Sequence, residues 1–451
     1  MKRNVAFFLA FAGLLLAQQT GSRMPPLKFT DTTLDNGLRV IILEDHFAPL
    51  YALAICYKVG SRDERQGRTG FAHLFEHMMF KGSENVGAGE HFYDIFTKGG
   101  GANGNTNTDR TMYYEVLPKN QLDLGLYLEA DRMRSLAITK ENLDNQRQAV
   151  KEERRQGIDN QPYGPTSEKV DGLIYDNFAY QHSVIGSMAD LDAATVEDVQ
   201  QFFKTYYAPN NAVLALAGDV DAKDTLARVK KYFGGIPRQP APKPVDLTEP
   251  EKPGERRGRL EDRLARVTRV EIDYRVPEIT NPQTRALIVA APILGGGESS
   301  RLYQKLVKEK ETAIQVACIV DGRDGPSTLR IVAYLRPGKT SQEAEGVISE
   351  EIAKLNAEPV SEKELERVRT TIRRGIPAVR ESMLNSATAL AEDAALYNDP
   401  NRINSEPDQR IAVTAADIQK AAQAWLRTPN RVVMITDPPP PPPMPSRKQQ
   451  D

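Results

Sequence analysis

The chain has 451 residues, which is too long for one ordinary hydrophobic core and predicts at least two domains. Hydrophobic residues make up 40% of it and charged residues 27%, as in a soluble globular protein. The formal net charge is -2, so the overall balance does not indicate a nucleic-acid partner or an anionic membrane surface.

The N-terminus has the pattern of an export signal over residues 1–20. Lys2 and Arg3 precede an almost wholly apolar stretch from Val5 to Ala17, and Ala17 is a small residue suited to a cleavage site. This stretch is too short to span a bilayer comfortably, which favours cleavage over an uncleaved membrane anchor. We therefore expect an exported protein, periplasmic or secreted, without stable membrane insertion.

Alternating hydrophobicity and turn residues predict several strands in the first part of the chain. A turn at Asp35–Gly37 is a hairpin signal. Strands are expected at 38–43, 51–59, 111–117 and 212–217. Helices are expected at 69–80, 121–135 and 141–157. Because helices and strands mix without strict β-α-β alternation, the sequence predicts an α+β fold with largely antiparallel sheets.

Two halves are expected, at residues 27–237 and 258–436. The linker between them, 238–257, is rich in Pro, Lys and Glu and should be extended. A proline-rich tail at 437–451 ends the chain and should be solvated.

The two halves look like diverged copies of one unit. Near the end of each half, an N-cap threonine opens an amphipathic helix, and a Pro-Asn break leads into an apolar strand. This unit begins at Thr195 in the first half and at Thr414 in the second. The matching order indicates an internal duplication.

Two of the five histidines lie one helical turn apart. Side chains on a helix step about 100° per residue, so His73, Glu76 and His77 project from one face. Two imidazoles in this arrangement can share a tetrahedral zinc ion, and Glu76 is placed to act as the general base. The pattern favours a catalytic zinc site over a helix with two unrelated histidines.

A zinc site of this type needs a third protein ligand and an open position for water. The helix expected at 141–157 offers four carboxylates: Glu141, Asp144, Glu152 and Glu153. Spacing alone does not choose among them, because a charged helix of this kind is usually solvated.

The stretch from His73 to His77 resembles the H-x-x-E-H signature of the inverzincin metallopeptidases, which include pitrilysin, insulysin and the mitochondrial processing peptidase. The likeness recurs along the chain, at 59–64, 81–83, 99–106, 111–114, 150–155, 207–211, 218–219 and 296–303. The chain length is similar to that of the short bacterial members with two domains. The resemblance implies two homologous pitrilysin-like α/β-roll domains, each a largely antiparallel sheet packed with helices.

In that family a glutamate well downstream completes the zinc site. The matching position is Glu153, which lies 76 residues after His77. Glu152 is the alternative, because an alignment slip of one residue would exchange the two. Other members often carry an acidic residue seven positions before this ligand, where this chain has Gln146. Gln146 can hydrogen-bond an imidazole but brings no charge to it.

Asn103 matches a family asparagine near the scissile bond. The strand after it is similar to the edge strand on which family members bind an extended peptide by β-augmentation. The resemblance therefore implies peptide recognition mainly through backbone hydrogen bonds.

The second half departs from the family pattern at two positions. Active members draw an arginine and, seven residues on, a tyrosine from the domain that faces the zinc. This chain has Val307 and Ile314 there, and neither can donate a hydrogen bond to a developing oxyanion. The resemblance implies a zinc-bearing subunit completed by a homologous partner, as a heterodimer or homodimer. A weakly active monomer is the alternative.

The sequence therefore predicts a zinc-dependent endopeptidase subunit that hydrolyses short or unfolded peptides, with Zn2+ as cofactor and no nucleic-acid partner. The rival prediction is a non-catalytic subunit that binds peptides or supports assembly and keeps the fold. The intact set of His73, Glu76 and His77 argues against this rival, whereas Val307 and Ile314 argue for it.

Overall fold

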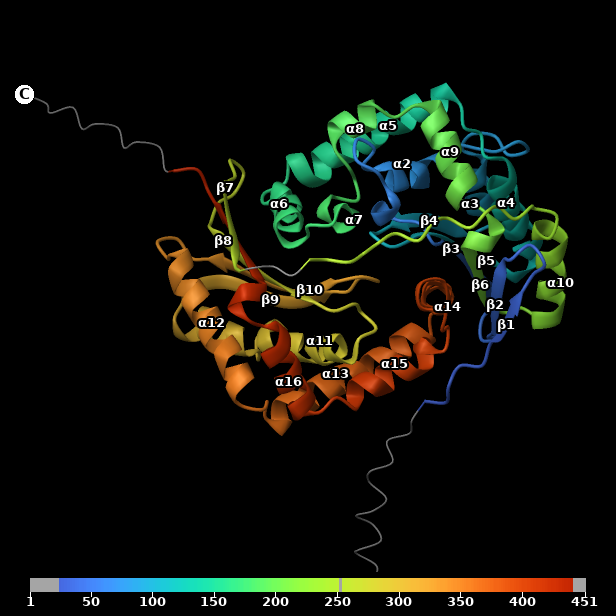
Figure 1. Cartoon of the computed structure of the whole chain (residues 1–451). Coiled ribbons are helices and arrows are strands. Elements are labelled where there is room, and N and C mark those ends of the chain that lie inside the picture. The colour runs from blue at the N-terminus through green and yellow to red at the C-terminus, as the bar shows by residue number, and fades with distance from the viewer. Residues whose placement is uncertain (1–23, 251–253, 441–451) are drawn as a thin grey trace, which may run out of the picture.

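The computed structural model describes residues 24–250 and 254–440, which form two halves, each a sheet covered by helices (Figure 1). The expected export signal at 1–20 lies outside the described residues, as does most of the expected tail. In the part of the chain that is described, no helix is both long enough and apolar enough to cross a membrane.

The first sheet has six strands in the order β1-β2-β6-β3-β5-β4. Their bounds are β1 (Thr30–Thr33), β2 (Arg39–Glu44), β3 (Leu50–Tyr57), β4 (Gly101–Thr106), β5 (Thr111–Pro118) and β6 (Ala212–Gly218). Only the pairing of β2 with β6 is parallel among these described strands. The hairpin predicted before β2 is confirmed, and Gly37 adopts the left-handed conformation (φ 91°) that this turn requires.

The first half also contains a set of helices, most of which lie on the face of this sheet that α14 (Met383–Tyr397) of the second half does not cover. They are α2 (Phe71–Met78), α3 (Glu90–Thr97), α4 (Leu122–Ser135), α5 (Lys140–Arg154), α6 (Gly164–Ile174), α7 (Phe178–Gln181), α8 (Met188–Asp192), α9 (Val196–Tyr206) and α10 (Ala222–Phe233). Short 3-10 turns lie at Ser61–Asp63, Lys119–Gln121 and Pro209–Asn211, and α5 continues into a π-helical segment at Arg155–Asp159.

The second sheet has the order β7-β11-β8-β10-β9. Its strands are β7 (Arg256–Glu261), β8 (Arg269–Val276), β9 (Ala313–Asp321), β10 (Ser327–Leu335) and β11 (Arg431–Asp437). The accompanying helices are α11 (Pro282–Gly295), α12 (Ser341–Ala357), α13 (Glu362–Arg380), α14 (Met383–Tyr397), α15 (Arg402–Ile411) and α16 (Ala415–Trp425), with π-helical and 3-10 segments at Tyr303–Glu309 and Thr428–Asn430.

The order of the second sheet repeats the order β2-β6-β3-β5-β4 of the first, and again one pair, β7 with β11, is parallel. The prediction of an α+β fold with largely antiparallel sheets is confirmed. Thr195 and Thr414 cap α9 and α16 by accepting hydrogen bonds from the backbone of Asp198 and Asp417. β7 begins at Arg256, inside the expected linker, so the extended connector ends earlier than predicted.

One helix of each half packs against the sheet of the other half (Figure 1). Side chains of β3 alternate between the two faces of the first sheet. Leu53 and Ile55 enter the core of the first half, whereas Ala52 and Ala54 pack against α14 from the second half. In return, α6 packs against β7 and β11 of the second sheet. This exchange joins the halves by apolar burial.

Candidate metal centre

The two motif histidines lie on α2, whose opposite side is anchored in the first core. Phe71, Leu74 and Phe75 are buried there. The His73 and His77 rings therefore project together from the free side, with their centroids 4.8 Å apart. The helix bounds agree with the predicted stretch 69–80 to within two residues at each end.

Helix α5 packs against α2 and brings one carboxylate to both rings. Glu153 Oε2 lies 3.5 Å from His73 Nε2 and 3.3 Å from His77 Nε2. One candidate ligand atom from each of the three residues lies within 4.8 Å of the other two. Glu152 points elsewhere, because its carboxylate binds Arg155 and Gln156. The structure thus brings Glu153, and not Glu152, to the histidines.

The protonation states of this group suit a metal. Burial and the neighbouring His77 lower the pKa of His73 to about 4, so its imidazole is neutral at neutral pH and has a free lone pair. The contact with His77 also lowers the pKa of Glu153. Two imidazoles and one carboxylate are a donor set that zinc accepts in catalytic sites. These residues therefore fit a zinc ion.

Glu76 lies on the same helix but turns toward the sheet. It is 8% exposed, and Thr106 Oγ1 donates a hydrogen bond of 2.6 Å to its carboxylate. A Cβ at Gly104 would lie 3.1 Å from Glu76 Cγ, so the glycine allows β4 to pass close to this side chain. Burial raises the pKa of Glu76.

The edge strand beside Glu76 is β4 itself, which carries Asn103. The expectation that the strand after Asn103 forms the edge is therefore wrong, because β5 lies between β3 and β4. Asn103 is exposed and accepts a hydrogen bond from the backbone of Gly104. Its side chain projects from the face of β4 opposite to Thr106, since side chains alternate along a strand.

Gln146 is buried on the same face of α5 as Glu153, two turns earlier. It donates its amide to Asn145 Oδ1. His73 Nδ1 is buried without a hydrogen-bond partner among the described residues. The structure therefore does not give Gln146 the contact with an imidazole that the resemblance implies.

Two neighbours of Glu76 received no role from the sequence: Thr106 and Arg110. The Arg110 guanidinium lies in the turn after β4 and lowers the pKa of Glu76 by its charge. Arg110 is held by Glu392 of α14 at 3.0 Å. Alternation along β4 places Gly104 and Thr106 on one face, but only the sheet pairing shows that this face meets α2.

Val307 and Ile314, which stand where the family pattern has arginine and tyrosine, differ in their exposure to solvent. Val307 is 8% exposed and belongs to the second core. Ile314 is 51% exposed on the edge strand β9. Neither side chain carries a hydrogen-bond donor.

A second group of candidate ligands lies buried between α3, β5 and α4. One ligand atom from each of His91, Glu115 and Glu129 lies within 4.8 Å of the others. His91 Nε2 and both carboxylate oxygens of Glu115 have no hydrogen-bond partner in the described structure. Both oxygens of Glu129 accept from Arg132.

Charge balance favours a shared proton over a metal in this second group. Two carboxylates and the guanidinium of Arg132 leave one negative charge, which one proton neutralises. A divalent cation would leave a net positive charge in the interior, where an uncompensated charge is strongly unfavourable. Burial and Glu129 raise the pKa of Glu115 to about 8, in agreement with a neutral acid.

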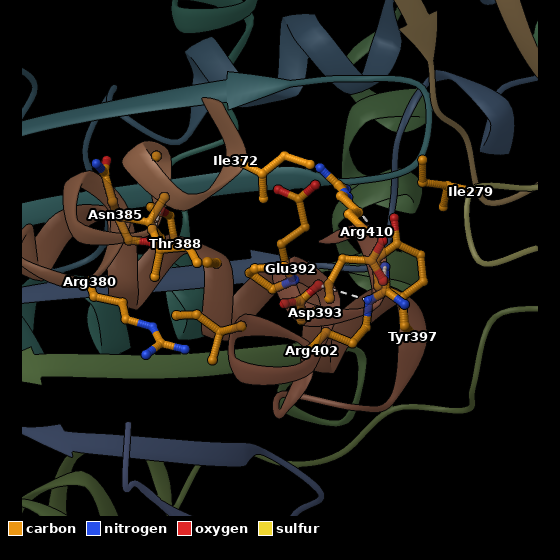
Figure 2. A pocket seen from close by; sticks show the side chains of 17 residues that line it. Ile279, Ile372, Arg380, Asn385, Thr388, Glu392, Asp393, Tyr397, Arg402 and Arg410 are labelled. Carbon is orange, nitrogen blue, oxygen red and sulfur yellow. Dashed lines mark hydrogen bonds and ion pairs between the residues drawn. The ribbon is translucent and has the colours of Figure 1, made fainter. Parts of the chain in front are cut away.

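A cavity of about 620 Å³ lies in the second half, between α13, α14 and α15 (Figure 2). Four of its charged side chains form pairs: Asp393 binds Arg402 at 3.2 Å, and Glu406 binds Arg410 at 3.1 Å. It contains none of the residues that converge at α2 and α5. The cavity is therefore separate from the candidate metal centre.

Comparison with known proteins assigns the class. A family model described as insulinase, peptidase family M16, matches residues 39–184, and a model described as peptidase M16 inactive domain matches residues 193–372. Zinc protease PqqE of Helicobacter pylori is 28% identical over 415 residues, which cover 91% of this chain and 93% of that protein. An uncharacterized zinc protease of Mycobacterium leprae is 28% identical over 406 residues and covers 88% of each chain.

Solved structures agree on the architecture. The crystal structure of a protease from Helicobacter pylori superposes with a TM-score of 0.87 at 27% identity and covers 91% of this chain and 100% of its own. A peptidase M16 inactive domain from Pseudomonas fluorescens gives 0.83 at 17% identity, covering 91% and 98%, which shows the fold alone. The architecture is that of two-domain M16-like peptidases. The chain belongs to the M16 peptidase family, of the two-domain bacterial type, and the resemblance noted in the sequence is confirmed.

The protonated state of Glu115 leads to a prediction about pH and stability. The carboxyl has a pKa of about 8 when folded and about 4.3 when unfolded. The raised pKa of Glu115 therefore contributes its full stabilisation below the unfolded pKa of about 4.3. This stabilisation is lost as pH rises through the folded pKa of about 8. Glu115→Gln mimics the neutral acid. Between pH 5 and 8.5, wild type should lose at least about 1 kcal/mol of unfolding free energy relative to this variant. Urea titrations of both proteins at the two pH values measure this difference, and parallel pH profiles would contradict it.

Proposed function

We propose that this chain is the zinc-bearing subunit of an exported endopeptidase that hydrolyses short or unfolded peptides. The observation that carries the proposal is the convergence of His73, His77 and Glu153 beside a buried Glu76 that faces an edge strand. The curated relatives are named zinc proteases, which supports the metal and the reaction class. The pattern at residues 1–20 supports export, to the periplasm or the medium.

His73, His77 and Glu153 would hold the zinc ion. Zinc in such a site polarises a peptide carbonyl and lowers the pKa of a water molecule toward neutrality. The neutral state of His73 keeps its lone pair available, because burial opposes protonation of the ring. The packing of α5 on α2 holds Glu153 in place while leaving half of its side chain exposed (49%), so substrate can reach the site.

Glu76 acts as the general base. Its carboxylate accepts a proton from the attacking water and then delivers it to the leaving amine. Burial raises the pKa of Glu76, which makes its carboxylate a stronger base, and the hydrogen bond from Thr106 keeps it oriented. Arg110 limits this rise through its positive charge.

Strand β4 binds the substrate. It pairs only with β5 in the described sheet, so its outer edge has no partner strand and can add one extended peptide strand. The Gly104 N–H on this edge would exchange its bond to Asn103 Oδ1 for one to the peptide. Gly104 brings this backbone close to Glu76, and a scissile bond laid along β4 would therefore lie near the base. Recognition through the backbone suits peptides without fixed structure. Asn103 contacts the substrate from the exposed side of the strand.

A homologous partner completes the site. Val307 and Ile314 provide no donor for the oxyanion, and the second half matches a model described as an inactive domain. A second subunit that carries arginine and tyrosine at the matching positions supplies the donors. A peptide-binding subunit without catalysis is the second candidate function, which the same two residues favour.

Glu76→Gln tests the base. The variant should retain zinc, because Glu76 is not a ligand, and kcat should fall by at least about 100-fold, the usual contribution of a general base. Zinc content is measured by mass spectrometry, and hydrolysis with a quenched peptide library in the assembly that is active for wild type. Hydrolysis at the wild-type rate by a preparation free of contaminating proteases would refute this role.

Glu153→Gln and Glu152→Gln form a matched pair that tests the third ligand. Glu153→Gln should weaken zinc binding by about 10-fold or more, because the amide loses the charge that holds the ion. Glu152→Gln should bind zinc as wild type does, because its side chain points away toward Arg155. Competition with a chelator measures both dissociation constants. Equal losses in the two variants would contradict the assignment.

Mixing subunits tests the partner. The chain alone should cleave the peptide library at least about 100-fold more slowly than its mixture with a homologous subunit bearing the arginine and tyrosine, in line with the effect of an oxyanion donor. A mixture with the Tyr→Phe form of that subunit is the control and should be slow. Full activity of the isolated chain would exclude the partner requirement. Peptide binding without cleavage in every mixture would favour the non-catalytic function.

A further inference from the structure

The N-terminus of α2 lacks a cap of its own. The helix begins after Gly70, which has the left-handed conformation (φ 84°) and no side chain to accept a hydrogen bond. The first N–H groups of any helix need acceptors from elsewhere. These acceptors matter for the site because His73 lies within the first turn of α2. Any shift of that turn would also move the His73 ring.

Glu64 supplies both acceptors. Its Oε1 accepts from the backbone N–H of Ala72, and its Oε2 accepts from that of Gly70, each at 2.8 Å. A carboxylate at this end of a helix also interacts favourably with the helix dipole. The Glu64 side chain is fully buried (0% exposed), however, and a buried carboxylate needs an opposite charge nearby.

His182 provides that charge. It follows α7, and its Nε2 lies 3.0 Å from Glu64 Oε2. Its Nδ1 lies 2.7 Å from the carbonyl oxygen of Phe178. A carbonyl only accepts hydrogen bonds, and so does an ionised carboxylate, so both ring nitrogens must donate. An imidazole donates from both nitrogens only when it carries two protons, and the side chain is 11% exposed.

The other ionisable groups that act on this pair have partners of their own. Asp63 accepts a hydrogen bond from the backbone of Gly60 at 3.0 Å. Tyr206 lies on α9 and donates to the carbonyl of Asp63 at 3.3 Å. Neither is in hydrogen-bond contact with His182 among the described residues, so the ring depends on Glu64 for its charge balance.

The segment after His182 packs closely against the start of α2. The Ser187 backbone donates to Thr69 Oγ1 at 3.0 Å, and Thr69 N–H donates to Asp190 at 3.0 Å. A Cβ at Gly186 would overlap the backbone of Thr69 and Gly70, so only glycine allows this approach. The contacts of His182 are therefore part of a tight junction at the first turn of α2.

We propose that His182 is a doubly protonated, positioning residue: with Glu64 it forms a buried imidazolium–carboxylate pair that sets the position of α2 and hence of His73 and His77. The inference rests on the proposed function only where it concerns zinc. His182 itself is not a ligand. The pair holds α2 through the bonds from Glu64 to its first turn, and a small displacement there moves both rings relative to Glu153.

The charge of the pair is tested directly in the full-length protein labelled with ¹⁵N-histidine and kept free of zinc. Both nitrogens of His182 should resonate in the protonated range at pH 7.5, and the assignment follows from signals that vanish in His182→Gln. A signal in the range of an unprotonated ring nitrogen would overturn the proposal. This readout does not depend on metal or activity, so it remains decisive if the chain proves to bind no zinc.

The positioning role is tested by zinc affinity and by amide exchange of α2. His182→Gln and Glu64→Gln should each weaken zinc binding at least tenfold and increase exchange of the α2 amides at least tenfold in the zinc-free protein. The double variant should lose little more than the worse single one, because the pair acts as a unit.

His46→Gln is the matched control, since His46 also contacts a carboxylate, that of Asp219 at 2.7 Å, but is 63% exposed and has no hydrogen bond to α2 among the described residues. It should match wild type in both measurements. Unchanged zinc affinity and exchange in His182→Gln would overturn the positioning role. Absence of zinc binding by wild type would count against the proposed function alone, and the exchange data would then decide the role of the pair.

Discussion

The contact between α2 and α5 is the constraint on which the candidate centre depends. Helix α2 presents two rings on one side because of its own periodicity, but two imidazoles do not complete a metal site. The third side chain, Glu153, lies 76 residues after His77 on another helix, and only the packing of the two helices brings it within 3.5 Å of both rings. Any change in their crossing would separate the three side chains.

The sheet places the edge strand β4 beside Glu76 of α2. Glu76 is enclosed between the helix and β4, where Gly104 permits the close approach and Thr106 orients the carboxylate. Such enclosure strengthens electrostatic interactions, because water screens them less. The same strand forms the free edge of the sheet. The candidate site therefore lies where a buried carboxylate meets the edge of the sheet.

The two halves share the same strand order, but the candidate zinc ligands are not repeated in the second half of the described structure. Five strands recur in the same order in both halves, and each sheet is covered by a helix from the other half. The converging ligands occur only in the first half of the described structure, and the second has Val307 and Ile314 where the family pattern has donors. We infer that the second half supports the first sheet through α14, and holds Arg110 through Glu392.

The sequence by itself determined what depends on local periodicity: the α+β class, the shared face of His73, Glu76 and His77, and the repeated unit of helix and strand. Family resemblance added Glu153, which spacing could not separate from Glu152. Tertiary structure decided the identity of the edge strand, the buried state of Glu115, the exchange of α6 and α14, and the pairing of Glu64 with His182. These features join residues far apart in the chain, and neither helical nor strand periodicity carries information about which distant elements pack together.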